Sequence, residues 1–452
     1  MGKKTTNVSE TTKDEFRCAG GEPWDGNYFV ATYPPFSTWT AACAQRVRER
    51  LASINGSTSS APLGLYVHIP FCVKRCDYCY YLSYADKTRT QQEQYVAALI
   101  EEARTYARSP ALKGQSLSFV YFGGGTPSVL EERMIARLLG GLQSQFPWAG
   151  VEEASFECAP RAVTASKLRS LRELGVTRIS LGVQSLDDAV LRLNGRVHLR
   201  KDVEAAYGWI RAAAFDVVNL DLMVGLPGES EASLAATLDA VIEMAPDSVT
   251  VYQTEIPHNT PLYRAESAGS LPTPVPNWTA KRARLAQAFA RLEEAGYVVR
   301  SAYSAVRDPQ KHRFVYQDRQ YRGADLIGLG VASFSYLSGR HHQNRGSYEA
   351  YVAGVAAGEL PIDRAYALSD EERLIREFVL QLKLGRLETA YFTEKFGVDV
   401  IERFSVPLRC CADRGWLTCD DGGVTLSRDG LLHVDRFLPM FYRSEHRDVR
   451  YS

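Results

Sequence analysis

Strand-like and helix-like stretches alternate from residue 65 to about residue 295, and this alternation constrains the fold more than any other feature. Short apolar runs predict six β-strands at Leu65–Phe71, Leu117–Phe122, Glu153–Cys158, Arg178–Gly182, Val217–Met223 and Ser248–Gln253. Amphipathic stretches predict helices at Gln92–Tyr106, Glu131–Gln145, Ala165–Leu174, Lys201–Ala214, Glu231–Met244 and Lys281–Ala295. Such alternation requires parallel strands covered by helices. The sequence therefore predicts an α/β fold, built as an incomplete barrel of six strand–helix units.

Polar and ligand-type residues follow the ends of these predicted strands. In parallel α/β barrels, active sites are built where the strands end. The residues at this rim are Cys72, Gly123 to Thr126, Glu157, Gln184, Asp221 and Glu255. Residues that only cap loops would be scattered over both rims, so the pattern predicts one polar mouth. Glycines 123–125 would let the backbone approach a ligand closely.

Three cysteines, Cys72, Cys76 and Cys79, come directly after the first predicted strand with the spacing C-x3-C-x2-C. Three thiolates can hold three irons of a [4Fe–4S] cube and leave the fourth iron open to a small molecule. A zinc knuckle and three unrelated buried thiols are the alternatives. A knuckle would need a fourth cysteine or histidine nearby, whereas Tyr80, Tyr81, Leu82 and Ser83 follow. The pattern favours an iron–sulfur cluster that performs chemistry.

Composition excludes several classes of function. With 452 residues, 45% of them hydrophobic, the chain is long enough for one large domain and a smaller one. Lys+Arg and Asp+Glu both number 53, so no net field favours nucleic acid or an anionic membrane. The polar N-terminus and the lack of a membrane-length apolar run predict a cytoplasmic protein. In that compartment the nine cysteines are expected to be thiols or cluster ligands.

Three parts are predicted along the chain: an N-terminal extension and linker over 1–61, the barrel with its C-terminal extension over 62–365, and a mostly helical, winged-helix-like cap over 366–452. The aromatic and proline-rich segment Tyr28–Trp39 is expected to pack onto the main domain, a lid being the alternative. Gly56–Ala61 is typical of a flexible linker.

The cap is predicted from helices at Asp370–Leu382, Leu387–Phe396 and Val400–Asp413, followed by a hairpin over Gly415–Leu426. Winged-helix modules often bind DNA. Here the acidic Asp420 and Asp421 at the hairpin tip are unsuited to an approach to phosphates, so a DNA-binding regulator is a weak hypothesis.

Five motifs in this order resemble the radical S-adenosylmethionine (SAM) enzymes, and in particular the relatives of oxygen-independent coproporphyrinogen III dehydrogenase. They are Tyr66–Cys72, Gly123–Ser128, Arg178–Ser185, Asn219–Pro227 and Gly328–Ser333. The resemblance covers most of residues 62–345. It implies a (β/α)6 partial barrel, a [4Fe–4S] cluster on Cys72, Cys76 and Cys79, and a C-terminal part that helps to bound the substrate cavity.

The resemblance also implies two SAM molecules in one cavity. Positions that match contacts to the cluster-bound molecule are Tyr66, Gly124, Glu157 and Phe334. Positions that match contacts to the second molecule are Tyr78, Gly125, Thr126, Gln184, Arg196, Asp221 and Glu255, of which Tyr78, Gln184 and Glu255 are the predicted catalytic residues. Carboxylates suit ribose hydroxyls and the sulfonium or ammonium charge, and Arg196 suits a carboxylate. Salt bridges at a barrel rim are the alternative explanation.

Two departures narrow the resemblance. The dehydrogenase has a further cysteine where this chain has Tyr81, and Asn or Asp stands in the family where this chain has Ala159 before Pro160. The chain looks most like class C radical SAM methylases, which include cyclopropane-forming enzymes of antibiotic and other natural-product pathways. That likeness implies a radical on the methyl group of the second SAM, which adds to an sp2 carbon of the substrate and gives a methyl group or a cyclopropane.

Several alternatives stay open. The chain could be a porphyrin- or haem-directed radical SAM enzyme, or a haem carrier that uses His258 or the His341-His342 pair as iron ligands. The expected partners are an unsaturated small molecule and a reductant protein, a flavodoxin or ferredoxin, with a methyltransferase-like protein conceivable. Neither nucleic acid nor membrane is expected.

Overall fold

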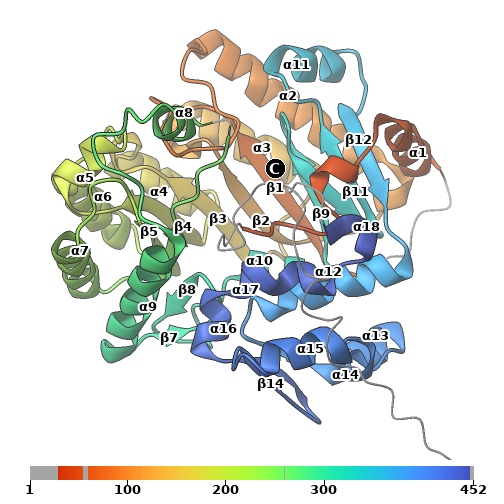
Figure 1. The fold of residues 1–452 in the computed structure, drawn as a ribbon. Coiled ribbons are helices and arrows are strands. Elements are labelled where there is room, and N and C mark those ends of the chain that lie inside the picture. Colours follow the sequence, from red (N-terminus) through yellow and green to blue (C-terminus); the bar gives the residue numbers. More distant parts are fainter. Residues whose placement is uncertain (1–28, 54–59, 259, 448–452) are drawn as a thin grey trace, which may run out of the picture. The chain divides into compact units, whose positions relative to one another are not determined.

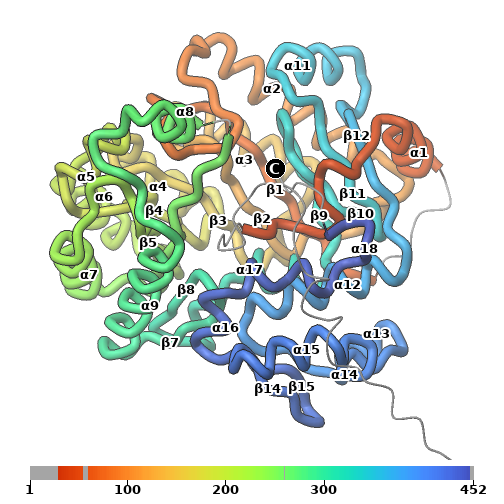
Figure 2. Tube along the Cα trace, viewed as in Figure 1, coloured from red at the N-terminus to blue at the C-terminus, as the bar shows by residue number. Residues whose placement is uncertain are grey.

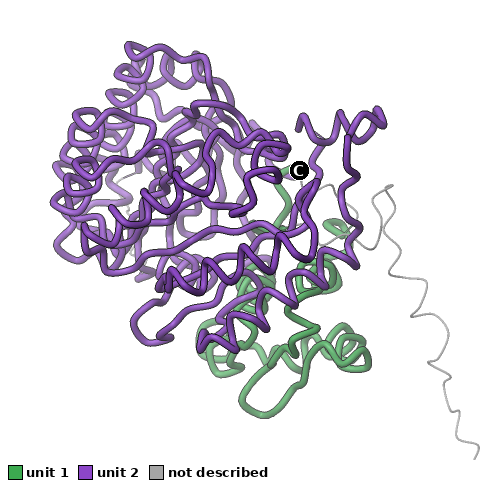
Figure 3. Tube along the Cα trace, turned by 90° about the vertical axis from the view of Figure 1, so that its left-hand side faces the viewer, with its two compact units in different colours: residues 1–37, 374–452 green, residues 38–373 purple. Residues whose placement is uncertain are grey.

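The structure is a computed structural model in which residues 29–53, 60–258 and 260–447 are described. The chain divides into two compact units, Thr38–Arg373 and a second unit of Met1–Ser37 with Leu374–Ser452 (Figure 3). The predicted boundaries at 61/62 and 365/366 stay a prediction. The predicted linker Gly56–Ala61 lies largely outside the described residues.

A single large sheet is the centre of unit Thr38–Arg373 (Figure 1). Its strands are β1 Leu63–Ile69, β2 Leu117–Gly124, β3 Glu153–Cys158, β4 Arg178–Gln184, β5 Val217–Val224, β6 Ser248–Gln253, β7 Val298–Val299, β8 Ser304–Val306, β9 Asp325–Leu329, β10 Phe334–Leu337, β11 Arg340–Asn344 and β12 Ile362–Ala367. Their order is β12-β11-β10-β9-β1-β2-β3-β4-β5-β6-β8-β7. Strands β9 and β1 to β6 are parallel, and antiparallel strands extend both edges.

Helices connect the strands, and most of them cover the outer face of the sheet (Figure 1), whereas Tyr316 of the short helix at 315–321 packs on Tyr121 of the inner face. They are α1 Ala41–Ala52, α2 Arg89–Arg108, α3 Glu132–Gln145, α4 Ala165–Glu173, α5 Asp188–Leu193, α6 Arg200–Ala212, α7 Glu231–Met244, α8 Pro261–Ser267, α9 Trp278–Glu294, α10 Val315–Tyr321 and α11 Tyr348–Ala356. Side-chain caps fix the starts of several of them. The Thr88 side chain accepts the N–H of Gln91 at α2, for example, and Asn277 accepts that of Ala280 at α9.

The two faces of the parallel strands differ in chemistry. Alternate residues such as Val67, Phe122 and Leu220 are fully buried and apolar. The residues between them include Ser155, Glu157, Ser180, Asn219, Asp221 and Thr250. Side chains alternate between faces along a strand, so these polar residues share the inner face. Most parallel sheets are apolar on both faces; a polar inner face therefore marks a reaction cavity instead of a filled core.

The predicted partial barrel is confirmed, and the strands at 153–158 and 248–253 and the helix at 231–244 have the predicted bounds. One correction concerns β9, a seventh parallel strand that pairs with β1 and carries three antiparallel strands on its other side (Figure 2). It is short and begins at the buried Asp325, which breaks the apolar pattern of a strand.

The second unit contains most of α12 Asp370–Leu382 and then β13 Arg386–Glu388, α13 Thr389–Phe396, α14 Val400–Arg403, α15 Ser405–Ala412, β14 Leu417–Asp420, β15 Gly423–Leu426, α16 Arg428–Leu432, α17 Val434–Phe437 and α18 Ser444–Arg447. Its sheet has the order β13-β15-β14, so β14 and β15 form the predicted hairpin. The helix predicted over 400–413 is split at Phe404.

Residues from Phe29 onward pack in this second unit. Lys383 Nζ lies 3.0 Å from Asp435 Oδ1, and both side chains are almost fully buried. The same ammonium donates to Val30 O at 2.6 Å, and Val30 N donates to Asp435 Oδ1 at 3.0 Å. The buried Tyr33 ring lies 4.7 Å from that of Tyr442. This part of the predicted aromatic segment is therefore packed, but within the second unit, whereas packing onto the main domain was expected.

Candidate functional site

The loop after β1 carries Cys72, Cys76 and Cys79 and is held by backbone bonds. Cys72 N donates to Tyr84 O at 3.0 Å, and Cys79 N donates to Cys76 O at 3.2 Å. The guanidinium of Arg75 donates twice to Cys79 O, at 3.1 and 2.7 Å. All three cysteines are half-buried. The predicted ligands therefore stand on one ordered loop that is accessible from the barrel mouth.

Two further elements bring polar groups to these sulfurs. Arg196 Nη1 donates to Cys76 Sγ at 3.1 Å, and Thr126 Oγ1 lies 3.5 Å from Cys72 Sγ. Burial raises the pKa of Cys72 and raises that of Cys79 to about 11. The metal-free loop thus carries thiols, and metal binding must release their protons.

The residues around the thiols fit a cluster and a ligand beside it. Among the described residues, no three ligating side chains converge as the ligands of a single metal ion do. A cube takes one thiolate for each of three irons, so such convergence is not required. Tyr78 Oη and Arg196 Nε are buried, and within the described part of the chain neither has a hydrogen-bond partner. Orphaned polar atoms beside the thiols indicate a site for a polar ligand.

Glu157, at the end of β3, is oriented by two donors. Tyr121 Oη donates to its Oε1 at 2.7 Å, and Gly124 N donates to its Oε2 at 3.2 Å. Burial raises its pKa to about 7. An oriented carboxylate with little solvation is suited to bind an ammonium group or a hydroxyl.

The glycine run beside Glu157 is needed for packing within the protein. A Cβ on Gly123 would lie 2.9 Å from Glu157 Oε1, and one on Gly124, whose φ is +112°, would lie 2.5 Å from the His68 ring. The expected reason for these glycines was the approach of a ligand. The structure adds a second reason, since protein atoms already fill the space that side chains would need, and the approach of a ligand stays a prediction.

Asp221, on the inner face of β5, is held in the same manner. Ser180 Oγ donates to its Oδ2 at 2.8 Å, and Asn219 Nδ2 donates to its Oδ1 at 2.8 Å. Burial raises its pKa to about 6. Both inner-face carboxylates are thus fixed by neutral donors and are partly protonated near neutral pH.

Gln184 ends β4 in a strained conformation. Its φ is +69°, and the register between β4 and β5 shifts between Gly182 and Gln184. A left-handed residue other than glycine costs about 1–3 kcal/mol and often marks a functional site. Gln184 Nε2 lies 3.2 Å from where a Cβ on Gly182 would be, and Arg196 Nη2 donates to Gly182 O at 2.8 Å. The strain therefore brings Gln184 and Arg196 to one place.

Tyr66 on β1 and Phe334 on β10 lie in one row of residues that runs across the sheet. Tyr66 pairs with Tyr121 on β2 and with Gly328 on β9. A Cβ on Gly328 would lie 2.1 Å from Phe334 O, so Phe334 is the next in the row. The hydroxyl of Tyr66 is hydrogen-bonded to His68 Nδ1 at 3.1 Å. Phe334 on β10 and Glu157 on β3 therefore each lie two strands from Tyr66 on β1, on opposite sides of it.

Further tyrosines line the same mouth: Tyr81, which the sequence singled out only as the residue in place of a cysteine, and Tyr252 and Tyr316, which sequence reasoning missed. Tyr81 and Tyr252 are 49% and 40% exposed, yet burial raises the pKa of Tyr81 to about 12 and that of Tyr252 well above its usual value. Side chains that are both accessible and surrounded by protein line a cavity. Tyr252 lies on β6, where inner-face alternation gave a signal. Tyr316 comes from α10, for which the sequence gave none, and its ring lies 4.6 Å from that of Tyr121.

Glu255 follows β6 at the same rim and is half-buried. Burial raises the pKa of Tyr80 most, Tyr81 comes second, and the charge of Glu255 is the third cause.

Ala159, where the family has Asn or Asp, has a local explanation, because Ala159 N donates to Ser128 Oγ at 3.0 Å. The end of β3 is thus capped by the loop after β2.

Comparison with known proteins agrees with this geometry. Residues 66–241 match the family model described as the Radical SAM superfamily. The heme chaperone HemW of Mycobacterium tuberculosis (strain H37Rv) is 32% identical over 339 residues, which cover 73% of this chain and 85% of that protein. The chain belongs to the HemN/HemW family of radical SAM proteins. Membership implies a [4Fe–4S] cluster and SAM as cofactors.

Other HemN/HemW family members extend the match. The oxygen-independent coproporphyrinogen III oxidase of Pseudomonas aeruginosa is 29% identical, with 86% of this chain and 88% of that protein covered. The solved structure of coproporphyrinogen III oxidase (HemN) from Escherichia coli, described as a radical SAM enzyme, superposes with a TM-score of 0.77 at 26% identity and covers 91% of this chain. The likeness thus extends well beyond the barrel core.

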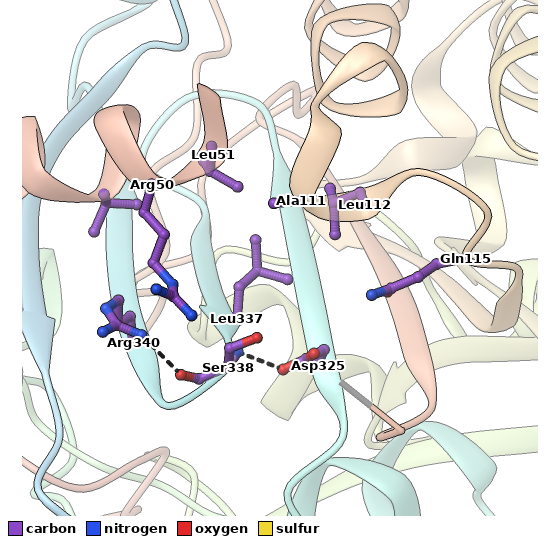
Figure 4. A pocket seen from close by; sticks show the side chains of 10 residues that line it. Arg50, Leu51, Ala111, Leu112, Gln115, Asp325, Leu337, Ser338 and Arg340 are labelled. Carbon is purple, nitrogen blue, oxygen red and sulfur yellow. Dashed lines mark hydrogen bonds between the residues drawn. The ribbon is translucent and has the colours of Figure 1, made fainter. Parts of the chain in front are cut away.

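A separate cavity lies at the opposite ends of the strands (Figure 4). Its lining includes Arg50, Gln115, Asp325, Leu337 and Arg340. Asp325 is the first residue of β9, whereas the site residues lie where the parallel strands end. This cavity is therefore distinct from the HemN/HemW-type site.

No helix in the described ranges is long and apolar enough to cross a membrane.

Proposed function

We propose that this chain is a radical SAM enzyme that uses two SAM molecules and transfers a SAM-derived carbon to an sp2 carbon of an unsaturated small molecule. The charge of the predicted site carries the proposal. Glu157, Asp221 and Glu255 are three carboxylates, whereas Arg196 is the single guanidinium among the predicted site residues. Each SAM has one net positive charge from its sulfonium, ammonium and carboxylate groups. Two such cations balance this set of side chains.

The polar side chains divide into two groups. Glu157, with Tyr66 two strands away and Phe334 two strands beyond Tyr66, is suited to the SAM on the cluster. Asp221 and Arg196, with Gln184, are placed for the second SAM, Arg196 receiving its carboxylate. When bound, the reduced cluster and SAM supply a carbon radical. The protein's part is to orient the two cations and to keep water out of the cavity.

Position 81 supports one-carbon transfer over porphyrinogen oxidation. The dehydrogenase to which the sequence is similar has a cysteine there, and this chain has an exposed tyrosine whose ring lies 4.6 Å from that of Tyr80. Neutral aromatic side chains at the mouth are suited to a flat, unsaturated substrate. Methyl transfer and cyclopropanation are both compatible with this site.

The second candidate is a tetrapyrrole-directed protein, and the names of the relatives support it more directly than they support the first. Those names are coproporphyrinogen III oxidase and heme chaperone. The site carboxylates match positions of that same family, so they do not separate the two candidates. As for a haem carrier, His341 and His342 are 3% and 0% exposed, and His342 Nε2 is hydrogen-bonded to Tyr106 Oη at 2.8 Å, so this pair is poorly suited to reach a haem iron. His258 is exposed, and its ring lies 4.3 Å from that of Tyr263.

Anaerobic reconstitution with iron and sulfide, followed by dithionite and SAM, tests both candidates. We expect 5′-deoxyadenosine together with S-adenosylhomocysteine or a SAM-derived adduct once an unsaturated substrate is present. Decarboxylation of added coproporphyrinogen would transfer the assignment to the second candidate. Tight haem binding without SAM cleavage would indicate a carrier. A flavodoxin or ferredoxin as reductant and a methyltransferase-like partner are part of the first proposal.

A further inference from the structure

Helix α2 presents two buried polar side chains to the end of the sheet. Tyr95 and Glu102 are seven residues apart, which is about two helical turns, so they lie on one face of the helix. Tyr95 is 0% exposed and Glu102 is 1% exposed. Neither residue is among the predicted site residues, and buried polar groups of this kind need an explanation.

Tyr95 connects two backbone segments through its hydroxyl. Its Oη donates to His68 O at 2.9 Å and accepts the N–H of Val331 at 2.9 Å. His68 lies near the end of β1, and Val331 belongs to the turn between β9 and β10. A Cβ on Gly330 would lie 2.4 Å from this hydroxyl, so the turn packs directly on Tyr95.

Glu102 holds the same turn from a second point. Its Oε2 accepts the N–H of Gly330 at 2.9 Å and the hydroxyl of Tyr351 at 2.6 Å. Its Oε1 accepts from Asn344 Nδ2 at 2.6 Å, and the same amide donates to Gly330 O at 2.9 Å. The carboxylate thus accepts from donors on three different segments.

The turn is held in a conformation that it would not adopt alone. The φ values of Gly330 and Ala332 are +103° and +55°. A left-handed alanine costs about 1–3 kcal/mol and persists only where its surroundings enforce it. The hydrogen bonds of Tyr95 and Glu102 at Gly330 and Val331 contribute to that enforcement, together with the bond from Ala332 N to Arg345 O at 2.9 Å.

Both segments carry predicted contacts of the cluster-bound SAM. Tyr66 precedes His68 by two residues, and Phe334 follows Val331 by three. The register places them in one row across β1, β9 and β10. A displacement of about 1 Å at such contacts is enough to change binding or rate by up to about 100-fold.

We propose that Tyr95 and Glu102 are positioning residues for the cluster-bound SAM, since Tyr95 fixes the distance between the end of β1 and the β9–β10 turn and Glu102 holds that turn in place. The proposal rests on the proposed function for the assignment of Tyr66 and Phe334. It differs from a purely structural role, which would affect stability but would not affect SAM more than other buried hydroxyls do.

Tyr95→Phe is the test, and Tyr297→Phe is its matched control. Tyr297 is 4% exposed and, like Tyr95, donates its hydroxyl to a backbone carbonyl, that of Pro246 at 2.8 Å. It precedes β7, at the opposite edge of the sheet from β9. Both variants lose one buried hydroxyl bond, and the removal of Tyr95 additionally leaves Val331 N–H without an acceptor.

The reconstituted full-length proteins are compared for iron content, for the KM of SAM and the kcat in 5′-deoxyadenosine formation, and for the electron paramagnetic resonance change of the reduced cluster on addition of SAM. We expect Tyr95→Phe to raise KM about tenfold with kcat within threefold and iron content unchanged. Tyr297→Phe should change KM less than twofold. Glu102→Gln, which turns an amide donor toward Asn344 Nδ2 or Gly330 N, should resemble Tyr95→Phe.

Equal KM values in Tyr95→Phe and Tyr297→Phe would overturn the positioning role and leave the proposed function intact. A wild type that cleaves SAM but transfers no carbon would overturn the proposed function alone, because KM is measured without the carbon acceptor. A wild type that binds no SAM would overturn both. Hydrogen exchange over residues 328–334 provides a further reading, with faster exchange expected in Tyr95→Phe only.

Discussion

The raised pKa of Glu157 makes a quantitative prediction about SAM binding. Burial raises this pKa to about 7 from the usual value near 4.5. In the SAM-free protein the carboxyl group is therefore mostly protonated at pH 5.5 and mostly ionised at pH 7.5. A cationic ligand prefers the ionised form, so affinity for the cluster-bound SAM should rise with pH. If only the ionised form binds, the dissociation constant falls about 25-fold between these two pH values.

Equilibrium dialysis of SAM against the anaerobic, reconstituted protein measures this dependence. The amino group of SAM has a pKa near that of an α-amine, about 7.7–8.0, so it stays mostly protonated over the window. His68, next to Tyr66, does not interfere, because burial lowers its pKa to about 4. The slope between pH 5.5 and 7.5 is therefore assigned to Glu157, with a smaller part from Asp221, whose pKa is about 6.

Glu157→Gln is the control for that slope. The amide oxygen keeps the bond from Tyr121 Oη, whereas the amide nitrogen cannot accept from Gly124 N. We expect about tenfold weaker binding at pH 7.5 and little change down to pH 5.5. A flat profile in the wild type, or an equal slope in the variant, would refute the assignment of Glu157 to the cation.

Three other substitutions test separate parts of the site and fold. Cys76→Ala should abolish both iron incorporation and SAM cleavage, whereas Cys419→Ala, on the exposed hairpin, should retain both. Arg196→Met should keep the cluster but weaken binding of the second SAM about 10- to 100-fold, because the hydrogen bonds to Cys76 Sγ and Gly182 O are lost. Arg192→Met is the control, since the Arg192 side chain is 61% exposed. Equal losses of SAM binding in the two variants would contradict the role of Arg196. Lys383→Met should lower the free energy of unfolding by about 3–5 kcal/mol in urea titrations, since it strands the buried Asp435. Adding Asp435→Leu should restore part of that loss, and no recovery would mean that the pair is not the cause.

The barrel could be predicted from the sequence because its signals are local. Apolar runs of strand length and amphipathic stretches between them need no knowledge of the rest of the chain, and all six predicted strands are present. The cysteine loop is local too, because its three ligands lie within eight residues. Residues at strand ends then follow from the rule that parallel strands end at one rim.

Features that depend on distant partners could not be predicted. Strand β9 begins with Asp325, which is buried because its carboxylate accepts the N–H of Ser338 at 2.7 Å. Tyr316 reaches the mouth from α10, whose place is set by Glu153 Oε1 and Oε2 accepting the N–H groups of Tyr316 and Val315 at 3.4 Å. The left-handed Gln184 arises from a register shift between strands. None of these partners is close in sequence.

The raised pKa values of the inner-face carboxylates link SAM binding to the pH dependence of stability. The sequence alone does not give the direction of that dependence. Glu157 and Asp221 have raised pKa values, so each contributes stability that is present below its unfolded pKa and is lost as pH rises through about 7 and about 6. Their ionised forms are the forms that bind a cation. The ligand-free protein thus carries an unfavourable desolvation at neutral pH that SAM relieves when its positive charge enters. We therefore expect SAM to raise the melting temperature more at pH 7.5 than at pH 5.5, with the difference reduced in Glu157→Gln, and an equal rise at both pH values would show that these carboxylates do not face the cation.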